Sequence, residues 1–456
     1  MRSRTKKGIG GGSFLKSAAL IAAGGFLAKL LGALYRIPLT NLIGGKGLGL
    51  YQLVYPVYCL LLTVSATGIP SSIAKLTAEA EGRGENSRSV LKTAMKLFLI
   101  IGGVGTVFMV ATAPFLAKLQ GSEEVLQGYF TLAPSVLLVS AISVFRGWFQ
   151  GHNKMFPTAA SEVIEQFVKV GVGLLFAYLF RDNIARAVVY LLLAVSISEG
   201  VALLFMWLYF KRCNGLQKTT NEGGRVALSV ILRLSIPVTL SSILLPVSAL
   251  LDSVLVPRLL GAYTGDAITL YGLFSGGAVT IVNLPVSVCY GLAAASIPRI
   301  AGAGKEGARG RILFSLLITI LVGGGSAVGL YLFAQPIVKL IFRSLQGEEL
   351  STLISLVKGL SLSALTLSCV QTLSACLTAQ GKPQYAAISM AVAMTVKTAV
   401  YLFLLPNAEV SVFGMVVATN IAYAVAFFLN LLYNLKVSKK KTPPKQPVMV
   451  SEGGEG

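Results

Sequence analysis

The sequence predicts an all-α membrane protein with about twelve transmembrane helices in two pseudo-symmetric six-helix lobes. Hydrophobic residues make up 54% of the 456 residues and charged residues only 12%, whereas about 25% of the residues in a soluble domain are charged. Apolar stretches of about 20 residues, the length that crosses a bilayer, occupy most of the chain. Short motifs of the first half also recur in the second half.

The apolar stretches are separated by short polar loops, and no segment between them is long enough for a separate domain. The expected spans are 13–38, 48–70, 93–116, 126–145, 156–180, 187–210, 227–256, 267–296, 312–337, 351–378, 384–405 and 411–434. We therefore expect an N-terminal lobe at 1–210, a cytoplasmic linker at 211–226 and a C-terminal lobe at 227–435. The polar segment 436–456 is expected to be a disordered basic tail.

Lysine and arginine are unevenly divided between the two sides that these spans define. Of the 39 Lys and Arg residues, 24 lie in the terminal segments and one set of alternate loops, and 7 lie in the other set. The positive-inside rule assigns the richer side to the cytoplasm, so both termini are expected there. Membrane topology thus accounts for most of the formal net charge of +21, and we expect no nucleic-acid partner.

The sequence repeat supports a transporter. Residues 50–53 (LYQL) match 270–273 (LYGL), and Lys169 matches Lys397, at offsets of 220 and 228. Repeated lobes with a binding site at their interface are typical of secondary transporters. An old duplication without functional meaning remains the alternative.

Four cations inside the spans are the candidate substrate-binding residues. A cation in hydrocarbon costs about 2.5–3.5 kcal/mol on insertion scales, so it must face protein, water or an anion. Lys29 and Arg36 are seven residues apart and share one face of the first span, while Lys169 and Arg233 lie in the fifth and seventh spans. We predict that they bind an anionic substrate. Snorkelling to the interface is the alternative for Arg36.

Four acidic residues inside the spans are the candidate polar residues of a cavity. Glu162, Glu165 and Lys169 lie on one stripe of the fifth span, with Glu165 and Lys169 in the favourable i,i+4 order for an ion pair. Glu199 lies in the sixth span and Asp252 in the seventh. A structural ion pair that seals the packing of the lobe is the alternative for the acids of the fifth span, and pairing with another span of the same lobe is the alternative for Glu199.

Prolines and a polar residue predict irregular helices in the second half. Pro237 and Pro246 predict kinks in the seventh span. Asn283 and Pro285 indicate a break in the eighth span.

Signals of catalysis are absent. The only histidine lies in a short loop, no P-loop occurs, and neither the carboxylates nor the five cysteines have metal-ligand spacing. We therefore expect a protein that is not an enzyme, with no cofactor, metal site or disulfide.

Four segments resemble the stage V sporulation protein B / MurJ-like polysaccharide flippases. Residues 31–44 (LGALYRIPLTNLIG) and 47–58 (GLGLYQLVYPVY) are similar to the opening of these proteins. Residues 145–155 (FRGWFQGHNKM) resemble their cytoplasmic loop, and 251–260 (LDSVLVPRLL) their seventh span. The resemblance implies the multidrug/oligosaccharidyl-lipid/polysaccharide exporter fold and export of an undecaprenyl-linked sugar, typically lipid II. It also implies a substrate-binding role for Arg36 and, more loosely, Lys29.

The sequence departs from some relatives. The second and eighth spans lack the arginines that Gram-negative lipid II flippases carry there, and 41–52 lacks their acidic residue. Some relatives bind sodium through acids of the seventh and eleventh spans. Because 384–405 contains no acid, we predict no such site.

These observations predict a transporter that flips an undecaprenyl-pyrophosphate-linked oligosaccharide across the bacterial cytoplasmic membrane by alternating access. Its expected partners are this lipid-linked substrate and the bilayer, and we expect a monomer with a role in peptidoglycan synthesis or sporulation. A cation-coupled multidrug exporter of the same fold is one alternative. A non-transporting membrane scaffold for cell-wall synthesis is another, and it would need no cations in a cavity.

Overall fold

The computed structural model describes residues 11–213, 228–289 and 305–439, and for some residues of α1 and α8 only the backbone. These residues form helices and no strand. Within them, nine helical segments are long and apolar enough to cross a membrane. Every predicted span is helical over nearly all of its described part, although several spans are divided between two helices, and this confirms the all-α polytopic fold.

The first lobe contains the helices of the first half. They are α1 (Gly11–Ala66), α2 (Ile69–Gly82), α3 (Arg88–Leu119), η1 (Glu123–Val125), α4 (Leu126–Leu132), α5 (Pro134–Gly151), α6 (Phe156–Leu179) and α7 (Ile184–Cys213). The first two predicted spans form one continuous helical run, α1, and only Gly44 has non-helical backbone angles, with φ at 65°. Glycine adopts this conformation without steric cost, so the chain reverses direction there without a loop.

The second lobe contains the helices of the second half. They are α8 (Leu228–Ser242), α9 (Leu244–Leu260), α10 (Ala267–Gly272), the π-helical turn η3 (Leu273–Ala278), α12 (Lys305–Leu332), α13 (Ala334–Ile341), α14 (Gly347–Ala379), α15 (Pro383–Leu404) and α16 (Phe413–Lys439). The limits of the two domains remain a prediction. The start of the second half nevertheless contacts the first lobe, since Ser235 Oγ on α8 donates to Ser72 Oγ of α2 at 3.0 Å.

Three local expectations for the second half are corrected or refined. The eighth span is helical through Asn283 and Pro285, and its irregularity is the earlier π-helical turn at 273–278. The seventh span is interrupted between α8 and α9, three residues before Pro246. Residues 436–439 of the expected disordered tail continue α16 as helix; the rest of that tail and of the linker lies outside the described residues.

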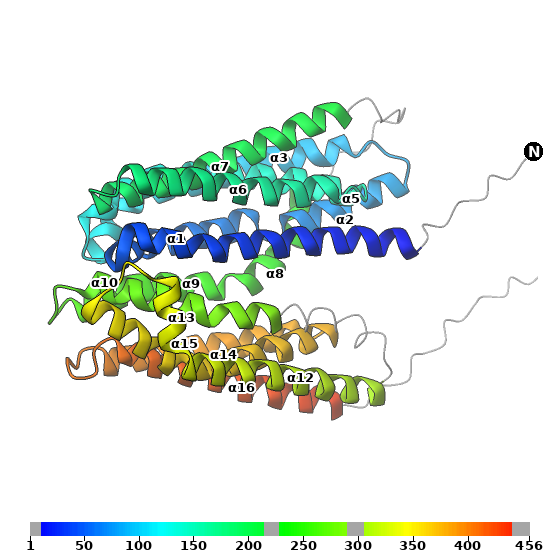
Figure 1. The fold of residues 1–456 in the computed structure, drawn as a ribbon. Coiled ribbons are helices and arrows are strands. Elements are labelled where there is room, and N and C mark those ends of the chain that lie inside the picture. The colour runs from blue at the N-terminus through cyan, green and yellow to red at the C-terminus, as the bar shows by residue number, and fades with distance from the viewer. Residues whose placement is uncertain (1–10, 214–227, 290–304, 440–456) are drawn as a thin grey trace, which may run out of the picture.

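The two lobes contact each other closely at the end of the molecule that carries Gly44 and α10 (Figure 1). A Cβ atom at Gly49 would lie 2.1 Å from the Ile268 carbonyl oxygen, and one at Gly272 would lie 2.4 Å from the Gly45 carbonyl oxygen. Only glycine permits this backbone approach. The groups of helices separate toward the end where α1 begins (Figure 1).

Polar side chains add contacts between the lobes at the same end. Asn41 Nδ2 donates to the Ile341 carbonyl at 3.0 Å, and its Oδ1 accepts from the Ser344 amide at 3.0 Å. Gln120 Nε2 donates to Ser253 Oγ at 3.1 Å. Because these groups are matched across the interface, this end of the molecule is closed.

Candidate functional site

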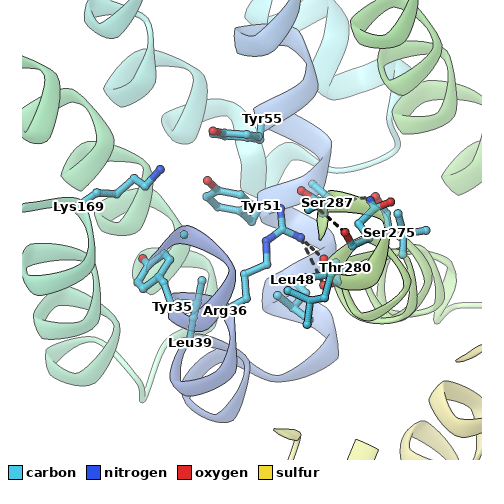
Figure 2. Close-up of a pocket in the computed structure, with 16 residues that line it drawn as sticks. Tyr35, Arg36, Leu39, Leu48, Tyr51, Tyr55, Lys169, Ser275, Thr280 and Ser287 are labelled. Carbon is cyan, nitrogen blue, oxygen red and sulfur yellow. Dashed lines mark hydrogen bonds between the residues drawn. The ribbon is translucent and has the colours of Figure 1, made fainter. Parts of the chain in front are cut away.

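A cavity of about 410 Å³ lies between the lobes. Its walls come from both halves of α1, from α6 and from the eighth span (Figure 2). The lining residues are Gly32, Tyr35, Arg36, Leu39, Leu48, Tyr51, Gln52, Tyr55, Lys169, Ser275, Gly276, Val279, Thr280, Asn283, Leu284 and Ser287. Two are cations and none of these described residues is acidic, so the cavity favours an anion.

Arg36 extends from the first lobe across the cavity to the second. Its Nη1 donates hydrogen bonds to Thr280 Oγ1 and, at 3.4 Å, to the Gly276 carbonyl oxygen (Figure 2). These two acceptors fix the position of the guanidinium group. They engage only one of its three nitrogens, so further N–H donors remain for a ligand.

Lys169 lines the same cavity from α6, 133 residues further along the chain. Its side chain extends toward Tyr51 (Figure 2), and within the described part of the chain its ammonium has no hydrogen-bond or ion-pair partner. The predicted pair with Glu165 is not formed. Glu165 Oε2 instead accepts from Arg146 Nη2 at 3.1 Å, which leaves the Lys169 charge available.

The four predicted acids do not line this cavity. Glu165 is paired with Arg146, and Glu162 lies half-buried on the same helix. Glu199 is buried in the first lobe, where its Oε1 accepts from Tyr58 OH at 3.3 Å. Asp252 Oδ2 accepts from Lys397 Nζ at 2.7 Å in the second lobe. The structure therefore places Glu165 and Asp252 in ion pairs within their lobes and Glu199 in a hydrogen bond within the first lobe.

The other two predicted cations are Arg233 and Lys29. Arg233 is exposed on α8 and is not among the lining residues. The side chain of Lys29 lies outside the described part of the structure. Among the three candidates whose side chains are described, Arg36 and Lys169 share one site and Arg233 lies outside it.

Two features of the cavity wall were not predicted from the sequence. Tyr51 and Tyr55 stack with ring centroids 5.0 Å apart. On the wall that the second lobe contributes, Thr280, Asn283 and Ser287 follow one another at i, i+3 and i+7, which places them on one helix face. This i, i+3, i+7 spacing of polar residues in an apolar span is visible in the sequence, and it is the signal from which this wall could have been predicted.

The arrangement combines a fixed guanidinium, a free ammonium, aromatic rings and uncharged hydrogen-bonding groups. Ligand sites are typically apolar and aromatic with a few placed polar groups. This cavity can hold an anion near Arg36 and Lys169 and uncharged polar groups beside it.

Comparison with known proteins shows the family to which this chain belongs. Residues 14–303 match the model of the polysaccharide biosynthesis protein family. The chain belongs to this family. This membership confirms the predicted resemblance to the stage V sporulation protein B / MurJ-like flippases.

Two relatives of this chain come from Bacillus subtilis strain 168. The chain is 27% identical over 350 residues to "Stage V sporulation protein B", covering 73% of this chain and 67% of that protein. It is 28% identical over 232 residues to "Lipid II flippase MurJ", covering 47% of this chain and 43% of the flippase. The chain is thus matched over less than half of the flippase.

The fold of this family member matches a solved transporter structure. An inward-facing multidrug resistance MATE transporter of the MOP superfamily superposes with a TM-score of 0.74 at 17% identity, over 91% of this chain and 96% of that one. The protein therefore shares the fold of this solved structure, and its long apolar helices make it a multi-pass membrane protein. This sequence identity is too low to infer the substrate of this protein from that of the solved transporter.

Proposed function

We propose that this protein flips a polyprenyl-pyrophosphate-linked oligosaccharide, a lipid II-like cell-wall precursor, across the bacterial cytoplasmic membrane by alternating access. The observation that carries the proposal is the cavity between the lobes, which presents Arg36 and Lys169 and no acidic lining residue among those described. Membership of the polysaccharide biosynthesis protein family supports a sugar-bearing substrate. The printed name of one relative, lipid II flippase, agrees with it.

Phosphate is the group that suits these two cations. A guanidinium binds phosphate oxygens through two parallel N–H donors, and an ammonium adds a second positive charge. Arg36 is held in place by the η3 carbonyl and Thr280, while Lys169 approaches from α6. A bound pyrophosphate would offset the cost of keeping both cations in a membrane-embedded site.

The closed end of the molecule fits one state of an alternating-access cycle. The positive-inside rule places both termini in the cytoplasm, which puts Gly49, Gly272 and Asn41 at the outer end. The contacts between the lobes there seal the cavity from the outside. In this assignment the structure is an inward-facing state, ready to receive a lipid-linked substrate from the cytoplasmic leaflet.

The proposal is tested by measuring lipid binding to the purified protein. Wild-type protein in nanodiscs should bind undecaprenyl pyrophosphate. Arg36→Ala and Lys169→Ala should each weaken binding about 10-fold or more, because a hydrogen bond to a charged group contributes about 1.5–3 kcal/mol. Arg258→Ala and Lys118→Ala, which remove exposed cations at helix ends, are the matched controls and should bind normally.

The same experiment separates the two alternatives. A multidrug exporter would bind organic cations, and acidic residues would be expected to line its cavity. A scaffold would bind neither ligand through the cavity cations. Preferential binding of a cationic dye over undecaprenyl pyrophosphate, or equal binding by Arg36→Ala and wild type, would contradict the proposal.

A further inference from the structure

The eighth span presents an uncharged polar stripe to the cavity next to Arg36. Thr280, Asn283 and Ser287 all line the cavity, and the helix is continuous between them. Thr280 is engaged by the Arg36 guanidinium. The helical rise of about 1.5 Å per residue places Asn283 about 4.5 Å and Ser287 about 10.5 Å further along the axis. The stripe therefore begins at the cationic site and leads away from it.

Two of these residues have hydrogen-bonding capacity to spare. The Asn283 side chain is exposed to the cavity and, within the described residues, its amide has no partner. Ser287 donates to the Asn283 carbonyl oxygen at 2.9 Å, which leaves the lone pairs of its hydroxyl oxygen free to accept. An amide and a hydroxyl together both donate and accept hydrogen bonds, and neither carries a charge.

The wall that the first lobe contributes supplies aromatic surface. Tyr51 and Tyr55 line the cavity and stack on each other, and their phenol ends point toward the side of the cavity where Lys169 lies (Figure 2). Aromatic rings with a polar tip suit a ligand that is apolar on one face and polar at its edge. A sugar ring has this character, with C–H groups on its faces and hydroxyl or acetamido groups at its edge.

We propose that Asn283 and Ser287 form a subsite for the uncharged sugar that is attached to the phosphate. This inference rests on the proposed function, because it takes Arg36 as the phosphate-binding end. A second anionic group is disfavoured at this position, since no cation lies on the stripe. The subsite makes Asn283 the residue that distinguishes a glycosylated lipid carrier from the bare carrier.

The test compares two lipids on the same variants. Affinities for undecaprenyl pyrophosphate and for undecaprenyl-pyrophosphoryl-N-acetylglucosamine are measured in nanodiscs. Asn283→Ala and Ser287→Ala should each weaken binding of the glycosylated lipid about 2- to 10-fold, the range expected for one lost hydrogen bond, and leave binding of the bare lipid unchanged. Arg36→Ala should weaken binding of both. Asn407→Ala removes an exposed asparagine that is not among the cavity-lining residues. It should change the affinity for neither lipid.

The outcomes separate the two claims. If Asn283→Ala and Ser287→Ala lower the affinity for both lipids equally, or for neither, the sugar subsite is overturned. If Arg36→Ala changes neither affinity while the stripe variants still affect only the glycosylated lipid, the phosphate site is wrong and the subsite stands. Equal melting temperatures of the variants and wild type exclude misfolding as the cause of any loss.

Discussion

Lys397 Nζ lies 2.7 Å from Asp252 Oδ2, and this ion pair joins α15 to α9 inside the second lobe. Lys397 is the residue that matches Lys169 in the sequence repeat. Both lysines lie on the helix that forms the fifth predicted span of their lobe, α6 and α15. One is neutralised by a carboxylate, and the other faces the cavity with no partner among the described residues. The repeat thus supplies a structural cation in one lobe and a ligand-binding candidate in the other.

The first prediction concerns the stability of this pair. Asp252→Asn or Lys397→Met alone leaves an uncompensated charge in the protein interior and should destabilise the fold by about 3–5 kcal/mol. The double variant removes both charges and should be much closer to wild type. Melting temperatures of the purified protein, combined in a double-mutant cycle, measure the coupling.

The exposed pair Lys46–Glu124, with Nζ and Oε1 3.0 Å apart, is the matched control for that cycle. Its coupling should not exceed about 1 kcal/mol, because solvent screens exposed charges. Equal coupling in the two pairs would contradict the structural role of Lys397.

Sequence periodicity and hydropathy predicted the spans well because both are local properties. The pairing of charges could not be predicted in the same way. The i,i+4 spacing favoured Glu165 with Lys169, but the packing of α5 against α6 brings Arg146 to Glu165 instead. Asp252 and Lys397 are 145 residues apart, and no local pattern connects them. Which cation remains free for a ligand is therefore decided by tertiary packing.

The second prediction is the membrane topology. Single cysteines at Glu123 and Asp182, both exposed, should react with a membrane-impermeant maleimide in intact cells, because the loops on their side contain few Lys and Arg residues. Cysteines at Glu85 and Lys382 should react only after the cells are opened. A cysteine-free variant is the background. The reverse pattern would reject the orientation and the inward-facing assignment.

The third prediction tests the closed end. A methyl group at Gly49 would lie 2.1 Å from the Ile268 carbonyl oxygen, and such overpacking costs about 1–3 kcal/mol in the state where the lobes touch. Gly49→Ala should therefore shift the population toward states open at this end. A cysteine at Ser275, which lines the cavity, reports the shift through faster maleimide labelling from outside.

Gly103→Ala is the control for this shift, since within the described residues a Cβ at that position would have no atom within 4 Å beyond its chain neighbours and the adjacent backbone of its own helix. It should leave the labelling rate at Ser275 unchanged. Identical rates in Gly49→Ala and Gly103→Ala would show that the glycine contact does not hold the end closed.

The fourth prediction distinguishes phosphate binding from simple charge at Arg36. Arg36→Lys keeps the positive charge but loses the planar fork of donors that suits phosphate. It should restore only part of the growth of a strain depleted of its lipid II flippase, whereas Arg36→Ala should restore none. Full growth with Arg36→Lys would favour the snorkelling alternative, in which Arg36 only anchors α1 at the interface. Membrane levels of each variant serve as the control.

Translocation of a labelled lipid-linked sugar in proteoliposomes tests the central claim most directly. The protein is reconstituted with a fluorescent undecaprenyl-pyrophosphoryl sugar, and the label that reaches the outer leaflet is quenched chemically. Wild type and Arg258→Ala should translocate the lipid well above protein-free vesicles. Arg36→Ala should be slower by about 10-fold or more, and the Arg36→Ala, Lys169→Ala double variant should be close to background. Wild-type rates in the double variant would contradict the account.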